Sequence, residues 1–188
     1  MFILTKEIGK GKERICFQHP NEGDKVVKVV YISSDKQMKR ELSIYHMLAN
    51  KKGISYEHIP KYYGEIETNK GTGYTFDKIM NDNDSLPKTL HWHLQNGKKL
   101  DEFSAELKEL KSYLLKHAII FCNDMSYEGN ILVKENSDGT LKLVVIDGLG
   151  DVVLIQWLNS IGFLVKKKIH RRWKRLIQRL KKFEMESV

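Results

Sequence analysis

The 188-residue sequence contains only two cysteines, Cys16 and Cys122, and three prolines. Two cysteines give no disulfide framework, which predicts a cytoplasmic protein. No apolar run approaches the length of a membrane span. The apolar start, Met1 to Leu4, is too short for the core of a signal peptide, and charged residues end it. There is also no internal repeat and no low-complexity tract. The few prolines and the 30% of charged residues argue against a disordered chain.

The charge balance is basic, with 32 lysines and arginines against 24 acidic residues and a formal net charge of +8. Such a surplus favours anionic partners, namely nucleotide phosphates, nucleic acid or acidic lipid. Hydrophobic residues make up 41% of the chain. That content is enough for a useful core, in one domain or in two small lobes.

The segment from Ile120 to Asp151 carries the main functional pattern. Two short apolar runs flank the polar residues 135–139, whose turn chemistry predicts a β-hairpin. Antiparallel pairing would bring Asn130, before the first strand, close to Asp147, after the second. An amide oxygen and a carboxylate are oxygen ligands of the kind that Mg²⁺ takes together with waters and substrate phosphates.

Asp124 lies just upstream of this hairpin and could orient a nucleophile. Together with the hairpin it has the layout of a kinase-like catalytic loop followed by a metal-binding Asp. The alternative is that Asp and Asn at these strand ends are only turn formers, which most hairpins contain.

Five strands and one helix are expected in residues 1–80, a small β-rich lobe. The helix runs from about Asp35 to Asn50, between the third and fourth strands. The strands are expected at Phe2–Ile8, Arg14–Gln18, Val26–Tyr31, Tyr62–Thr68 and Tyr74–Met80. Polar residues 81–85 predict a linker. Residues 81–188 then form a second, mainly helical lobe that includes an amphipathic helix from Leu100 to His117.

Gly9 and Gly11 separate the first two strands, and the amides of such a hairpin could cover phosphates, because no Cβ blocks a close approach. An ordinary hairpin turn is the alternative, since the third glycine of a kinase loop is absent.

Lys28 interrupts the third strand, and a buried charge is expensive unless it is paired. It either points to water from an edge strand or is held for phosphates. Glu41, on the following helix, could reach Lys28, as a helix glutamate does in a kinase small lobe. Glu41 could equally pair only with nearby basic side chains.

These parts follow one another in the order found in kinases. The sequence also resembles the YrbL family, which is named for the PhoP regulatory network, over most of its length. The segments that carry the resemblance are GKGKERICFQHP, KVVKVVY, KRELSIYHML, IPKYYGEIETNKGTGYTFDKI, GNILV and IDGLGD. The resemblance implies an α+β fold of the compact protein-kinase-like type, with a reduced large lobe, and it says little about substrate.

The sequence departs from the kinase pattern at the catalytic position. In typical kinases and aminoglycoside phosphotransferases the catalytic Asp lies five residues before the metal-binding Asn. Met125 stands there in this sequence, and Asp124 lies one residue further away. A one-residue bulge would restore the geometry; without it the base is missing. The short tail after Asp147 also removes most of a usual large lobe, so a peptide-docking platform is not expected.

Residues 166–182 form a dense basic helix with one apolar face. This pattern is typical of an interfacial helix on anionic lipid. The alternative is that the apolar face packs on the protein and the charges are solvated. Sequence-specific DNA binding is not expected, because helix-turn-helix and zinc spacings are absent.

Three functions therefore remain open. The first is a small kinase-like phosphotransferase that uses ATP and Mg²⁺ on an unidentified acceptor. Its catalytic residue is Asp124 and its metal ligands are Asn130 and Asp147. Its cofactor-binding residues are Gly9, Gly11, Lys28 and Glu41. The second is a catalytically weak nucleotide-binding regulatory module, a pseudokinase. The third is a basic protein that binds anionic surfaces.

Overall fold

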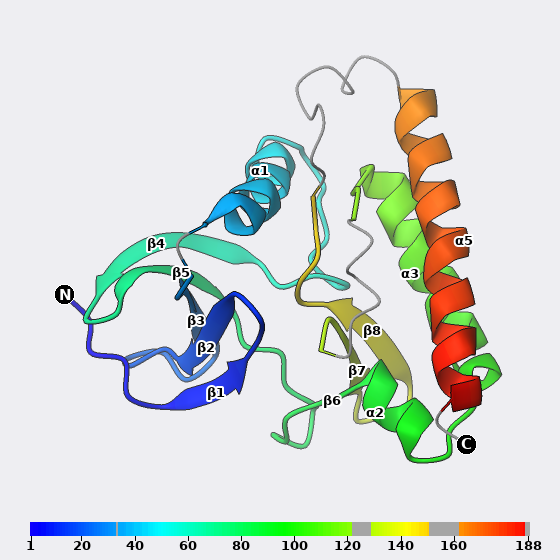
Figure 1. Ribbon diagram of the computed structural model, residues 1–188, viewed down its shortest axis with the longest axis horizontal. Helices are drawn as coiled ribbons and strands as arrows, with labels where there is room; N and C mark the ends of the chain where they lie inside the picture. The colour runs from blue at the N-terminus through cyan, green and yellow to red at the C-terminus, as the bar shows by residue number, and fades with distance from the viewer. Residues whose placement is uncertain (33, 122–128, 151–161, 187–188) are drawn as a thin grey trace. The chain divides into compact units, whose positions relative to one another are not determined.

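The computed structural model describes residues 1–32, 34–121, 129–150 and 162–186 (Figure 1). Strands and helices are both present, so the chain has the expected α+β character. The chain divides into two compact units. The first consists of Met1–Lys39 and Pro60–Ile79, and the second of Arg40–Ile59 and Met80–Val188.

The first unit is built on an antiparallel sheet of five strands in the order β1-β2-β3-β5-β4. The strands are β1 (Glu7–Lys10), β2 (Arg14–Gln18), β3 (Lys25–Val30), β4 (Tyr62–Thr68) and β5 (Gly71–Asp77). Successive side chains of β3 point to opposite faces. Val27 and Val29 lie on one face, in a buried cluster with Leu4 and Phe17, so Lys28 belongs to the other face.

The start of the chain differs from the expected strand Phe2–Ile8. Phe2 forms a parallel bridge to Thr68, at the end of β4, and its N–H donates to the Glu67 carbonyl at 2.8 Å. Asn69 Oδ1 accepts from the Leu4 N–H at 2.9 Å. These contacts hold the first residues at β4 and bury Leu4, so β1 begins only at Glu7.

The second unit combines a small antiparallel sheet, in the order β6-β7-β8, with helices. Its elements are most of α1 (Lys36–Ala49), then β6 (Lys88–Thr89), α2 (Leu90–Gln95), the 3-10 helix η1 (Leu100–Phe103), α3 (Ser104–His117), β7 (Ile131–Glu135), β8 (Leu141–Val145) and α5 (Gly162–Glu186). Helix α5 runs alongside α3 and also contacts α2 and η1 (Figure 1).

Residues 40–59, which the sequence assigned to the first lobe, cluster with the second unit. The Val145 N–H of β8 donates to the His58 carbonyl at 2.8 Å, and His58 Nδ1 donates to the Leu143 carbonyl at 2.7 Å. The Tyr113 hydroxyl of α3 donates to the Ser55 carbonyl at 2.6 Å. The segment after α1 is therefore bonded to β8 and α3. The boundary expected after residue 80 stays a prediction.

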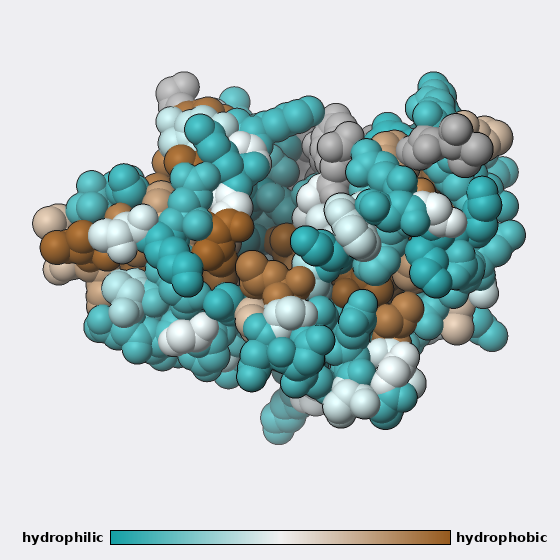
Figure 2. Space-filling model, turned by 90° about the horizontal axis from the view of Figure 1, so that it is seen from below, coloured by the Kyte–Doolittle hydropathy of each residue, from teal (hydrophilic) through white to brown (hydrophobic). Residues whose placement is uncertain are grey.

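Hydrophilic residues cover most of the molecular face that Figure 2 shows. In the described part of the chain, no helix combines enough length with enough apolar character to cross a membrane. Even α5, with 25 residues the longest described helix, carries six lysines and four arginines.

Candidate active site

Asn130 and Asp147 lie at the same end of the β7–β8 hairpin. The two strands pair from Glu135↔Leu141 to Ile131↔Val145. The ladder continues by one step, because the Ile146 N–H donates to the Asn130 carbonyl at 3.0 Å. Asn130 therefore stands opposite Ile146, the immediate neighbour of Asp147. The turn chemistry of residues 136–139 and the alternating strands produce this placement locally.

The chain that leads into the expected catalytic loop runs beside the residues that follow Asp147. The Gly150 N–H donates to the Ile120 carbonyl at 2.8 Å, and Phe121 forms an antiparallel bridge with Leu149. Residues 122–128 lie outside the described residues, so Asp124 and the expected bulge near it stay predictions. Phe121 nevertheless places the start of this loop next to the Asp147 segment.

The glycines after Asp147 allow helix α1 to approach this segment. The Gly148 N–H donates to Asp147 Oδ1 at 2.6 Å. Gly150 has φ +97°, and a Cβ there would lie 2.6 Å from the Arg40 carbonyl oxygen of α1. A side chain at position 150 would therefore separate α1 from the chain beyond Asp147.

Tyr45 connects two of the predicted site residues. Glu41 and Tyr45 are four residues apart on α1, so they share one face of the helix, and both are buried. Burial raises the pKa of the Tyr45 hydroxyl well above its ordinary value, and the nearby Glu41 carboxylate, Tyr113 and Asp147 add to this effect. The carboxylates of Glu41 and Asp147 thus both influence the same buried hydroxyl. Tyr45 is not among the predicted site residues, and its spacing of four residues from Glu41 is the signal that could have drawn attention to it.

Lys28 lies on the central strand of the five-stranded sheet. Its neighbours across the sheet are Cys16 on β2 and Tyr74 on β5, and its side chain is only 8% exposed. Its Nζ lies 4.5 Å from the centroid of the Phe76 ring. The edge-strand alternative is therefore wrong. Lys28 and Glu41 belong to different units, and their pairing stays a prediction.

Gly9 and Gly11 lie in the β1–β2 hairpin at exposed positions. Gly9 pairs with Cys16 after a bulge in β1, and the Gly11 N–H donates to the Arg14 carbonyl at 2.8 Å. A Cβ at Gly9 would meet nothing within 4 Å, and at Gly11 the nearest atom, the Arg14 carbonyl oxygen, would be 3.7 Å away. Neither glycine is required by the packing of the hairpin.

Asn130 and Asp147 stay the predicted metal ligands of the second unit. In the residues that the structure describes, no three His, Cys, Asp or Glu side chains gather in a group that could hold a metal ion. Magnesium usually takes one or two carboxylates from the protein and completes its shell with waters and phosphate oxygens. The predicted pair, Asp147 with Asn130, offers one carboxylate and one amide oxygen of this kind.

Comparisons with known proteins agree on one family. The family model described as PhoP regulatory network protein YrbL matches residues 4–181. The uncharacterized protein YrbL of Escherichia coli (strain K12) is 33% identical over 178 residues, which cover 90% of this chain and 82% of the relative. The protein of the same description from Shigella flexneri matches with the same identity and coverage. The chain therefore belongs to the YrbL family.

Proposed function

We propose that this protein is a small kinase-like phosphotransferase that uses ATP with Mg²⁺ and transfers the γ-phosphate to an acceptor hydroxyl. The observation that carries the proposal is the bonding around Asp147. Asn130 stands beside it at the end of the hairpin, and Phe121 leads into the Asp124 loop from the neighbouring strand position. The support is that main-chain bonds join three segments, namely those that contain the two proposed metal ligands and the one that ends at Phe121, before the proposed catalytic loop.

In this proposal the Asp147 carboxylate and the Asn130 amide oxygen hold Mg²⁺. When bound, the ion neutralises charge on the transferred phosphate. Asp124 aligns the acceptor hydroxyl and accepts its proton. Phosphoryl transfer depends mostly on positioning and charge stabilisation, so these few groups are a sufficient set.

The first unit supplies the residues that hold the phosphates. Lys28 is buried on the central strand of the sheet, where an ammonium group is rare in a purely structural role, which supports a functional role for it. The proposal keeps Glu41, which belongs to the second unit, as the expected partner of Lys28. The hairpin that contains Gly9 and Gly11 covers the phosphates, and the open space at Gly9 and the lack of a Cβ at Gly11 support a close approach by a ligand.

The proposal includes a compact kinase-like fold with a reduced large lobe. Its support is the order of the elements, namely a five-stranded antiparallel sheet with a helix after its third strand, and then α3, the loop and the β7–β8 hairpin.

The test is thermal unfolding with and without an ATP analogue and Mg²⁺. A ligand that binds only the folded state raises the melting temperature. We expect a magnesium-dependent rise in the unaltered protein and its loss in Asp147→Ala. Asp138→Ala removes an exposed carboxylate at the far end of the same hairpin and should keep the rise. Equal rises in the Asp147 and Asp138 variants would contradict the metal assignment.

A second candidate is a nucleotide-binding module without turnover. It is favoured by the spacing of Asp124, which lies six residues before Asn130 where typical kinases have five. The family description names a regulatory network, which suits a binding module as well as an enzyme. The two candidates share the nucleotide site and differ only in the role of Asp124.

A further inference from the structure

The apolar stripe of helix α5 packs against other helices of the second unit. Its buried residues follow one another at intervals of three or four: Val165, Ile169, Trp173, Leu176 and Leu180. They form one face of the helix, and this face packs on α3, α2 and η1. At the far end, the Phe183 ring lies edge-on to His91 of α2, with centroids 4.4 Å apart. The stripe is therefore already covered, and the helix cannot bury it in a membrane while this packing is kept.

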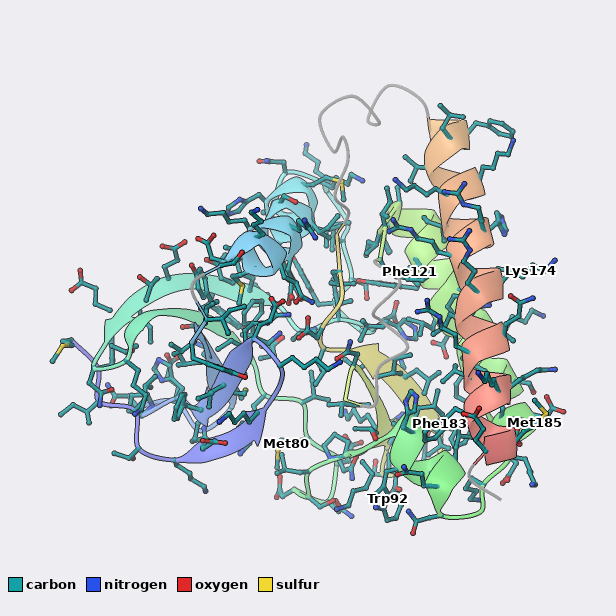
Figure 3. All side chains as sticks on the ribbon, in the orientation of Figure 1. Met80, Trp92, Phe121, Lys174, Phe183 and Met185 are labelled. Atoms are coloured by element: carbon teal, nitrogen blue, oxygen red, sulfur yellow. The ribbon has the colours of Figure 1, made fainter. Side chains whose placement is uncertain are left out.

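The opposite side of α5 is exposed and basic. From Gly162 to Lys182 the sequence contains no acidic residue. The exposed lysines and arginines, called the basic face below, are Lys166, Lys167, Arg171, Lys174, Arg175, Arg179, Lys181 and Lys182. In Figure 3, Lys174 points away from α3, as expected for the side opposite the buried stripe.

The positive charges on this helix are close enough to affect one another. Burial lowers the pKa of the Lys168 ammonium, and the neighbouring Arg172 and Arg171 lower it further. Lys182 of the basic face pairs with Glu186 within the helix, at 3.6 Å. A row of like charges on one exposed helix attracts an extended anionic partner.

Exposed apolar side chains stand at both ends of the basic face. Phe163 is 73% exposed and Leu164 43% exposed at its start, and Met185 is 73% exposed at its end. At 100° per residue, Leu164 and Met185 lie on the same outward side as Lys174, and Figure 3 shows Lys174 and Met185 there. The distance from Leu164 to Met185 along the helix is roughly 30 Å.

We propose that the basic face of α5 docks on the surface of an anionic lipid bilayer, with Phe163, Leu164 and Met185 entering the headgroup region at its two ends. Clusters of roughly four to eight lysines and arginines bind anionic lipid headgroups. The exposed apolar side chains at both ends of the helix favour a bilayer over a nucleic-acid duplex. A helix that lies on a bilayer can insert apolar side chains below the surface at both of its ends. The docking is parallel to the membrane and leaves the fold unchanged.

The test measures co-sedimentation with phosphatidylcholine vesicles that do or do not contain about one third phosphatidylglycerol. We expect binding only to the anionic vesicles and its loss between about 50 mM and about 300 mM salt, because exposed charges are screened. The variant K167Q/R171Q/K174Q/R175Q should bind on the order of 10²-fold more weakly. The control K6Q/K36Q/K52Q/K108Q removes four exposed charges elsewhere and should bind like the unaltered protein. Circular dichroism checks that both variants are folded.

Two further experiments distinguish lipid binding from binding to free phosphate or to nucleic acid. The variant F163S/L164S/M185S should weaken vesicle binding while it leaves the salt dependence unchanged. The lipid proposal would be overturned if inorganic phosphate at constant ionic strength displaced the protein from the vesicles. It would also be overturned if the protein bound a DNA or RNA duplex more tightly than the vesicles. Equal binding by the two charge variants would overturn it as well. Asp147→Ala should bind vesicles normally, so failure of the nucleotide proposal and failure of this one are distinguishable.

Discussion

Arg172 on α5 donates a hydrogen bond to the main-chain carbonyl of Phe121, the residue directly before segment 122–128. The Trp173 ring also lies edge-on to the Phe121 ring, at a centroid distance of 6.4 Å. Helix α5 therefore holds Phe121 through two consecutive residues, Arg172 and Trp173. The helix proposed to dock on lipid is thus in direct contact with Phe121, which directly precedes the segment that contains Asp124 in the sequence.

We expect Arg172→Ala to lower the free energy of unfolding by about 1–3 kcal/mol, because the carbonyl of the buried Phe121 loses its donor. Urea unfolding measures the change. Arg175→Ala is the matched control, since Arg175 is exposed on the same helix and its loss should change stability by less than about 0.5 kcal/mol. Equal effects of the two substitutions would show that the bond to Phe121 contributes nothing specific.

The variants Gly9→Ala and Gly11→Ala distinguish a role of these glycines in stability from a role in nucleotide binding. Neither position has a positive φ or a close neighbour, so the alanine variants should be as stable as the unaltered protein or more stable by up to about 1 kcal/mol. If phosphates approach these amides, the same variants should show a smaller rise in melting temperature with the ATP analogue and Mg²⁺.

Gly73→Ala is the control for this pair. A Cβ at Gly73 would lie 2.4 Å from Val27 Cγ1, so overpacking should cost about 1–3 kcal/mol. Unchanged nucleotide stabilisation in both hairpin variants would remove Gly9 and Gly11 from the proposed site.

Asp124→Asn distinguishes the enzyme from the binding module. The residue is proposed to contact the acceptor and not the phosphates, so nucleotide affinity should stay almost unchanged. ATP consumption should fall by roughly 10²-fold or more, the scale of losing a positioned acid–base group. An unaltered protein that binds nucleotide well and shows no turnover would favour the binding module, as would equal turnover in the two proteins.

Stability should fall as the pH decreases below about 6.5, the ordinary pKa of histidine. Burial lowers the folded-state pKa of His117 and of His93, and Lys116 and Lys51 lower that of His117 further. Between the unfolded and the folded pKa, the unfolded chain binds protons that the folded protein does not. The free energy of unfolding therefore decreases with falling pH and is unaffected by these groups above both values.

Urea unfolding at a series of pH values measures this dependence. His117→Gln should flatten the slope below about pH 6.5 even if it lowers stability overall. The exposed His46→Gln serves as the control. A slope that is the same in His117→Gln and in the unaltered protein would exclude His117 as a source of the acid sensitivity.

Local patterns in the sequence determined most of the elements. The bounds expected for β2 and β4 are those observed, and the expected helix at about residues 35–50 is α1, Lys36–Ala49. The polar turn at 135–139 and its flanking apolar runs predicted the β7–β8 hairpin. That hairpin in turn placed Asn130 near Asp147. These features depend on side-chain alternation, helical spacing and turn chemistry, all of which act between residues close in the chain.

Tertiary pairing decided what such patterns could not specify. The run of β-branched residues around Lys28 predicted a strand, but only the neighbours β2 and β5 make that strand central and bury the lysine. Likewise, the periodicity of α5 identified an apolar face without showing what covers it; contacts with α3, α2 and η1 did. Residues 40–59 joined the second unit through bonds from His58 and Ser55 to residues more than 50 positions away. Such long-range contacts depend on which surfaces meet once the chain is compact, and no local spacing encodes that choice.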